Sequence, residues 1–237
     1  MQRRAFLLAT AAAGVAPFAF AQSRSMKIGV IGSGRIGSTI GGLWVKAGHE
    51  VMFSDRDAEQ VKRAIDGLAP ELKPRARAGS VAQAAAFGDA VLIAVPYAAL
   101  PAIQQQVGAQ LKGKVVVDPN NPVASRDGEM GAQAREKGAG VSSAALLPGA
   151  RVVRAFNSWG YGLMAREANR PAPRMAIPVA ADDAAALKLG MQLVADAGFD
   201  PVAAGSLAAS KAFDLGSSVS GRVLTAPELR QALQLKP

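Results

Sequence analysis

The sequence contains no cysteine and a single histidine, His49. Without cysteine the chain cannot form a disulfide, an iron–sulfur cluster or a thiolate-ligated metal centre. One imidazole is too few for an ordinary zinc site, so we expect no metal site. A serine hydrolase triad would need His49 as its base, and the sequence has no Gly-x-Ser-x-Gly motif to carry the nucleophile. We interpret His49 as a structural residue and expect no catalytic acid or base.

Aromatic residues are few, at 5%, and the formal net charge of +9 shows a shortage of acidic residues. The basic residues are nevertheless scattered, with no run of Lys and Arg longer than two, so we expect no nucleic-acid partner. Half of the 237 residues are hydrophobic, which is enough for the core of one domain. A basic surface favours anionic small molecules as ligands.

The sequence also lacks an apolar run that would indicate a stable membrane anchor. The apolar stretch near the N-terminus, residues 5–16, is about a dozen residues long, too short to span a bilayer. It follows Arg3-Arg4 and includes Phe6-Leu7, which resembles the twin-arginine export motif, and Ala19-Phe20-Ala21 fits a small-x-small cleavage site.

This pattern predicts a twin-arginine signal peptide over residues 1–21, a linker over 22–26, and one domain over 27–237. The mature protein would begin at Gln22 and be periplasmic, exported in the folded state. Its formal charge would fall from +9 to about +7 with the loss of Arg3 and Arg4. If the leader is not used, or if translation starts at Met26, the protein is cytoplasmic.

From Lys27 onward, apolar runs of strand length alternate with segments of helical periodicity. The predicted strands cover residues 27–31, 50–54, 75–78, 90–95, 114–118 and 151–156. Asp57, Ser80 and either Asp182 or Asp183 stand where they would cap helices. This alternation predicts an α/β fold of the Rossmann type, a doubly wound and mainly parallel sheet.

A short α/β extension is expected at the C-terminal end of the domain. Strands are predicted over residues 174–180 and 198–202, with a helix between them that ends near residue 197. The tail from about residue 205 is predicted to be mostly helical.

The segment Gly32-Ser33-Gly34-Arg35-Ile36-Gly37 follows the first predicted strand and opens a helix. In this Gly-x-Gly-x-x-Gly pattern the first glycine permits a tight turn, the second lets a pyrophosphate approach the backbone, and the third allows close packing of helix and strand. The helix N-terminus adds oriented N–H groups and a partial positive charge. The pattern, in this context, predicts a dinucleotide-binding turn.

Asp55 and Arg56 follow the second predicted strand and indicate opposite cofactors. A carboxylate at this place binds the 2′-hydroxyl of NAD, whereas an arginine attracts the 2′-phosphate of NADP. Ser54 can add a hydrogen bond there. NADP and NAD both stay open on these residues alone, and Arg56 can also be an ordinary surface arginine.

Three further segments end predicted strands at the same edge of the sheet: Val95-Pro96-Tyr97, the segment from Asp118 to Pro122 that contains Asn120, and Asn157. Ligands of open parallel sheets bind beyond the carboxyl ends of the strands. Tyr97 would lie against a cofactor or pack a loop. The asparagines would contact a nicotinamide carboxamide or cap turns.

Taken together, these segments resemble the deazaflavin (coenzyme F420)-dependent NADP oxidoreductases and the related cytosolic domain of the STEAP metalloreductases. The resemblance runs from Met26 to about Lys211 and includes Gly48-His49-Glu50-Val51, residues 116–122, Arg154-Ala155-Phe156-Asn157 and residues 200–207. It implies hydride transfer between NADPH and a flavin or deazaflavin acceptor, a small-molecule partner, and a homodimer, which the apolar tail also favours.

The resemblance also implies roles for particular residues. Ser33, Gly34, Arg35 and Ile36 would form the pyrophosphate loop, and Pro96, Tyr97, Asn120 and Asn157 the nicotinamide pocket. Asp55 and Arg56 would stand at the 2′-phosphate site, where the family often has Ser or Thr in place of Asp55.

Two other functions fit parts of the sequence. One is an exported, non-catalytic dinucleotide-binding or sensing module. The other is a dehydrogenase of the 6-phosphogluconate or hydroxyisobutyrate type, but such enzymes carry a large helical domain and a catalytic lysine. The tail of about 30 residues is too short for that domain.

Overall fold

The computed structural model describes residues 24–235, so the predicted signal peptide over residues 1–21 lies outside the described residues. Six parallel strands form the main sheet in the order β3-β2-β1-β4-β5-β6. The strands are β1 (Lys27–Ile31), β2 (Glu50–Ser54), β3 (Ala76–Ala78), β4 (Ala90–Ile93), β5 (Val115–Asp118) and β6 (Arg151–Arg154). This is the strand order of the Rossmann fold, and the predicted fold class is confirmed.

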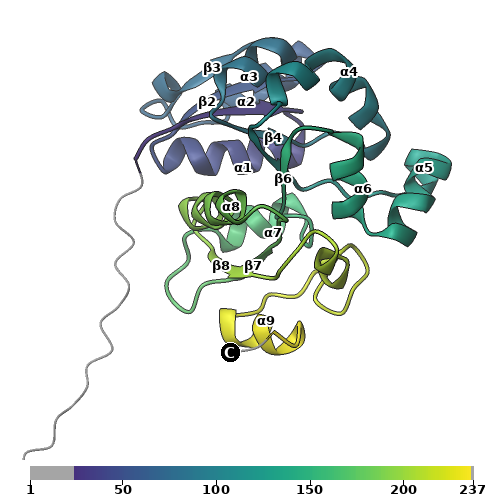
Figure 1. Cartoon of the computed structure of the whole chain (residues 1–237). Helices are drawn as coiled ribbons and strands as arrows, with labels where there is room; N and C mark the ends of the chain where they lie inside the picture. The colour runs from purple at the N-terminus through teal and green to yellow at the C-terminus, as the bar shows by residue number, and fades with distance from the viewer. Residues whose placement is uncertain (1–23, 236–237) are drawn as a thin grey trace, which may run out of the picture.

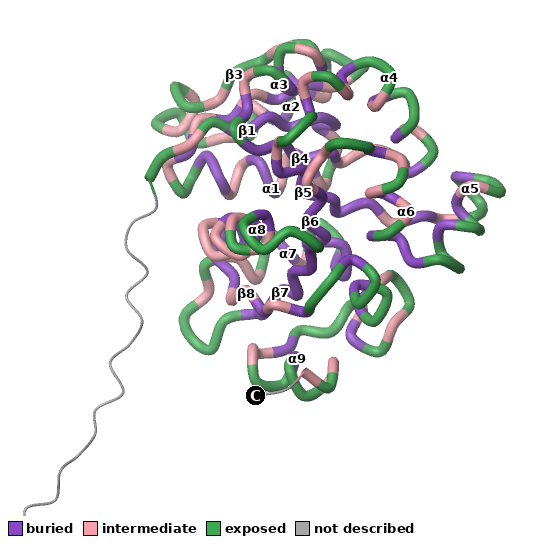
Figure 2. Tube along the Cα trace, in the orientation of Figure 1, coloured by how far each residue is buried: buried purple, intermediate pink, exposed green. Residues whose placement is uncertain are grey.

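Helices cover both faces of this sheet (Figure 1). One face packs against α1 (Arg35–Lys46), α2 (Ala58–Asp66) and α8 (Ala184–Asp196). The other face packs against α3 (Val81–Phe87), α4 (Leu100–Leu111) and α6 (Ala139–Leu146). Because strands between two helical layers are shielded on both sides, β4 and β5 are buried along their whole length (Figure 2).

Capping side chains fix where several helices begin. Asp57 accepts a hydrogen bond from the Glu59 N–H at the start of α2, and Ser80 forms a reciprocal capping box with Gln83 at α3. Asp183, rather than Asp182, accepts from the Ala186 N–H at the start of α8. The predicted caps are therefore confirmed, and of the two aspartates considered for α8 the cap is Asp183.

The C-terminal extension is a two-stranded parallel sheet of β7 (Ala176–Val179) and β8 (Asp200–Ala203), connected by α8. It joins the main sheet through one antiparallel bridge between Arg154 and Ala180. The short helix α7 (Tyr161–Glu167) lies between β6 and this extension and contacts α1. The predicted α/β extension is thus present.

The structure corrects the sequence analysis in two regions. The tail after residue 205 is mostly turns, with one 3-10 turn, Ala209–Phe213, and one short helix, α9 (Ala226–Ala232). Glycines with positive φ, Gly205, Gly216 and Gly221, interrupt a helix there. In addition, α5 (Ala124–Lys137) and α6 occupy a stretch to which no element was assigned. No helix of residues 24–235 is both long and apolar enough to cross a bilayer.

Candidate functional site

The glycine turn joins β1 to α1, as predicted. Gly32 has φ +94°, and a Cβ on it would overlap the Ala94 carbonyl. A Cβ on Gly37 would overlap the carbonyl of Gly32, so both positions exclude a side chain for reasons internal to the fold. These are the tight-turn and close-packing roles expected of the first and third glycines.

Gly34 is different, because a Cβ there would meet no atom within 4 Å. The fold itself does not require glycine at this position, where φ is −64°. Gly34 is the N-cap of α1, and the N–H groups of Gly34, Arg35 and Ile36 find no hydrogen-bond partner among the described residues. Open space in front of unpaired N–H groups at a helix N-terminus suits a pyrophosphate.

Asp55 braces the turn from the end of β2. Its Oδ2 accepts a hydrogen bond from the Ser33 N–H at 2.8 Å, and its Oδ1 accepts from the Asp57 N–H at 3.1 Å. The carboxylate therefore connects the glycine turn to the start of α2. Each oxygen keeps lone pairs free for further donors, such as a ribose hydroxyl.

Ser54 does not face this site, contrary to our expectation. Its side chain is fully buried, and its Oγ donates to the Val30 carbonyl at 2.8 Å. The Ser33 Oγ in turn donates to the Ser54 carbonyl at 3.0 Å. The position of Ser54 in the strand turns its side chain inward. Its hydroxyl proton is used in the hydrogen bond to Val30, which ties β2 to β1.

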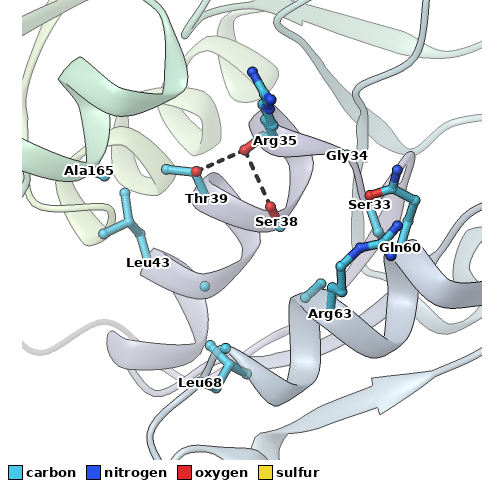
Figure 3. Close-up of a pocket in the computed structure, with 13 residues that line it drawn as sticks. Ser33, Gly34, Arg35, Ser38, Thr39, Leu43, Gln60, Arg63, Leu68 and Ala165 are labelled. Atoms are coloured by element: carbon cyan, nitrogen blue, oxygen red, sulfur yellow. Dashed lines mark hydrogen bonds between the residues drawn. The ribbon is translucent and has the colours of Figure 1, made fainter.

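A cavity of about 650 Å³ lies beside the turn, between α1 and α2 (Figure 3). Its polar lining includes Ser33, Gly34, Arg35, Thr39, Gln60 and Arg63. Arg56 is exposed and is not among the described residues that line it. The ring of Tyr161 lies 5.2 Å from the Arg35 guanidinium and steadies it at the mouth of the turn.

Asn120 holds the carboxyl ends of β4 and β5 together. Its Oδ1 accepts from the Val95 N–H at 3.1 Å, and its Nδ2 donates to the Ile93 carbonyl at 2.8 Å. This amide positions Val95 and Pro96, which are half-buried and exposed respectively at the end of β4. The sequence analysis considered a nicotinamide contact or a turn cap for Asn120, and the spacing of the motif alone could not indicate a brace between two strands.

Tyr97 is packed in the core and is not among the described residues that line the cavity beside the glycine turn. Its side chain is fully buried among residues of α3, α4 and the neighbouring strands. The hydroxyl lies 3.5 Å from the Ser143 Oγ, and burial raises the pKa of the Tyr97 phenol. The structure therefore supports the loop-packing interpretation of Tyr97 and corrects its expected place in the nicotinamide pocket.

Asn157 is buried at the end of β6 with one polar atom left over. Its Nδ2 donates to the Phe213 carbonyl at 3.0 Å, while its Oδ1 has no hydrogen-bond partner within residues 24–235. A buried amide oxygen without a donor is costly, so this atom is suited to accept an N–H group from a ligand. The preceding residue, Phe156, has φ +63° and is held by edge contacts to Trp44 and Phe199.

Arg154 has a role that the sequence analysis did not assign, although its segment was quoted for the resemblance. The guanidinium is fully buried and donates to the carboxylates of Asp118 and Asp214, to the Asn120 carbonyl and to the Asn121 Oδ1. It therefore connects β5, β6 and the C-terminal loops behind Asn157. The partners of Arg154 lie 33 to 60 positions away in the sequence, so the only available signal was an arginine directly after two valines in the strand.

Asp127 makes a second polar connection at this edge. Burial raises its pKa, but hydrogen bonds from the Arg126 side chain and from the Val123 and Ala98 N–H groups more than offset this, so the net pKa is lowered. The ionised carboxylate thus holds the turn after β4 against the start of α5.

His49 lies at the opposite end of the sheet from the glycine turn. Its Nδ1 accepts from the Met26 N–H at 3.3 Å and its Nε2 lies 3.0 Å from the Asp196 Oδ2. Both ring nitrogens are satisfied, which confirms the structural interpretation. Among residues 24–235, no group of three or more potential ligands could hold a metal ion.

Comparisons with known proteins agree with this geometry. Residues 27–122, from β1 to the loop after β5, match the family model "NADP oxidoreductase coenzyme F420-dependent". Among curated proteins none matches the sequence. A hypothetical protein from Sinorhizobium meliloti is 24% identical with a TM-score of 0.70, covering 86% of this chain and 97% of that chain.

Two further solved structures are similar. A candidate F420-dependent NADP reductase from Arthrobacter sp. FB24 is 25% identical with a TM-score of 0.61, covering 79% of this chain and 88% of that chain. A 3-hydroxyisobutyrate dehydrogenase from Mycobacterium tuberculosis is 18% identical with a TM-score of 0.59, and this chain spans only 57% of its length. This last likeness shows the shared fold.

The fold and the glycine turn define an NAD(P)-dependent oxidoreductase of the Rossmann type. Within that class, residues 27–122 match the model of the coenzyme F420-dependent NADP oxidoreductase family.

Proposed function

We propose that the protein transfers hydride between NADP(H) and a flavin or deazaflavin acceptor. The observation that carries the proposal is the cradle at Gly34, where unpaired N–H groups face open space at the start of α1. The description of the matching family and the candidate reductase from Arthrobacter support the choice of cofactor and acceptor. The link to STEAP metalloreductases stays a prediction.

The chain's own residues would bind and orient the reactants. The N–H groups of Gly34, Arg35 and Ile36 would hold the pyrophosphate, and the Asn157 Oδ1 would accept from the carboxamide N–H₂ at the far end. The cofactor held there would supply the hydride, two electrons with one proton, and any further proton needed by the acceptor would come from solvent. No acid or base of the chain is needed, and rate enhancement would come from positioning.

Calorimetric titration of the protein from Gln22 onward, first stripped of carried ligand, tests this proposal. We expect NADPH to bind more tightly than NADH, and the bound NADPH to be oxidised when a flavin or deazaflavin is added. Loss of NADPH absorbance in rapid mixing measures that second step. Binding without turnover by any acceptor would favour the non-catalytic module, and absence of binding by either dinucleotide would exclude both.

We also propose that residues 1–21 direct export of the folded protein to the periplasm. The motif Arg3-Arg4 and the pattern at Ala19-Phe20-Ala21 support this. In the native host we expect a periplasmic protein that begins at Gln22. The double variant with Arg3→Lys and Arg4→Lys should remain in the cytoplasm. Intact-mass measurement of each fraction checks both; a full-length cytoplasmic product of the unaltered gene would contradict the proposal. The homodimer stays a prediction that light scattering would check.

A further inference from the structure

The side chain of Arg63 reaches back along α2 to the loop that follows β2. Helical side chains lean toward the helix N-terminus, and the Arg63 Nη2 lies 3.6 Å from the Oδ2 of Asp57, the N-cap of α2. The guanidinium is therefore near the end of β2, although Arg63 belongs to the last two turns of the helix. The sequence pattern indicated only residues at the end of β2 and directly after it, Ser54, Asp55 and Arg56.

Arg63 and Gln60 line the same cavity as the glycine turn. Figure 3 shows the side chains of Gln60 and Arg63 extending toward Ser33 across the space between α1 and α2. Arg56, in contrast, is exposed and makes no hydrogen bond or ion pair within residues 24–235. A ligand that is bound at the glycine turn and extends into this cavity contacts Arg63 and not Arg56.

The charges around the cavity favour a second anionic group. The described residues that line it include the guanidinium groups of Arg35 and Arg63 and no carboxylate. The ion pair of Arg63 with Asp57 is weak, because the two side chains are 61% and 55% exposed. A phosphate dianion, which takes two parallel N–H donors from a guanidinium, would compete well with this partner.

We infer that Arg63, with Gln60 beside it, makes the main contact to the 2′-phosphate of the cofactor's adenosine ribose. Arg63 is then the residue that distinguishes NADP(H) from NAD(H), and Arg56 is an ordinary surface arginine. The inference rests on the proposed function, since it assigns a role within the same cofactor site. Asp55 is held toward the glycine turn by two backbone N–H groups and is not among the described residues that line the cavity of Arg63.

Three glutamine variants test the inference: Arg63→Gln, Arg56→Gln, and the matched control Lys62→Gln. Lys62 is an exposed neighbour on α2 that lines a different cavity. Calorimetric titration of each with NADPH and with NADH should show NADPH binding weakened about tenfold or more in Arg63→Gln only, with NADH binding changed less than about twofold. A larger loss in Arg56→Gln, or equal losses for both dinucleotides in Arg63→Gln, overturns the inference.

A fourth variant should strengthen the contact between Arg63 and the 2′-phosphate. Asp57→Asn keeps a good helix cap and removes the carboxylate that competes for Arg63, so NADPH should bind up to about fivefold tighter. Unchanged or weaker NADPH binding in this variant counts against the inference. The failure of the proposed function looks different, because then the unaltered protein itself binds neither dinucleotide.

Discussion

Replacing Gly34 by valine is expected to abolish dinucleotide binding while leaving the protein folded. A side chain at Gly34 has free space and an ordinary φ, so the fold tolerates it. The same side chain would occupy the volume in front of the Arg35 and Ile36 N–H groups. Loss of several hydrogen bonds to a charged group should weaken NADPH binding by about 100-fold or more.

The matched control for this experiment is Gly162→Val. Gly162 also has open space around its Cβ position, but it lies in α7 and outside the glycine turn. Thermal unfolding should show similar midpoints for both variants, and titration should show a loss of binding only in Gly34→Val. If Gly34→Val binds NADPH like the unaltered protein, the pyrophosphate lies elsewhere and the proposed site is wrong.

Replacing Arg154 by methionine is expected to give the largest loss of stability. The substitution preserves much of the side-chain volume but leaves the carboxylates of Asp118 and Asp214 without their cationic partner. Breaking one side of a buried ion pair costs about 3–5 kcal/mol, and denaturant unfolding would measure it. NADPH should restore part of the stability if the variant still binds it.

Arg151→Met provides the comparison, because Arg151 lies on the same strand and pairs with Asp183 at the surface. The two side chains are 35% and 49% exposed, so this change should cost less than about 1 kcal/mol. Similar losses of unfolding free energy in the two variants would mean that the Arg154 network contributes no more to stability than a surface ion pair.

The sheet and the glycine turn could be predicted from the sequence because their determinants are local. A continuous apolar run such as residues 90–93 indicates a strand shielded on both faces, and the spacing of Gly32, Gly34 and Gly37 follows from the geometry of one turn. In contrast, α5 and α6 contain glycines that break helical periodicity, including Gly128 with φ +60°.

The features that sequence analysis missed depend on residues far apart in the chain. The position of Tyr97 in the core depends on Ser143 and α6, and the role of Arg154 depends on Asp214, which is 60 positions away. The orientation of Ser54 depends on its hydrogen bond to Val30, which is 24 positions away. Arg63 was missed for a different reason, because the expected site was restricted to residues adjacent to the strand end.

The first described residues of the chain enter the domain on the side away from the glycine turn. The Ser25 Oγ donates to the Gly48 carbonyl and the Met26 N–H donates to His49, both at the amino ends of β1 and β2. The five residues of β1 then separate this edge from Gly32 by about 16 Å. The described chain therefore enters at the opposite end of β1 from the glycine turn, so a molecule bound at the turn would leave the contacts of Ser25 and Met26 undisturbed.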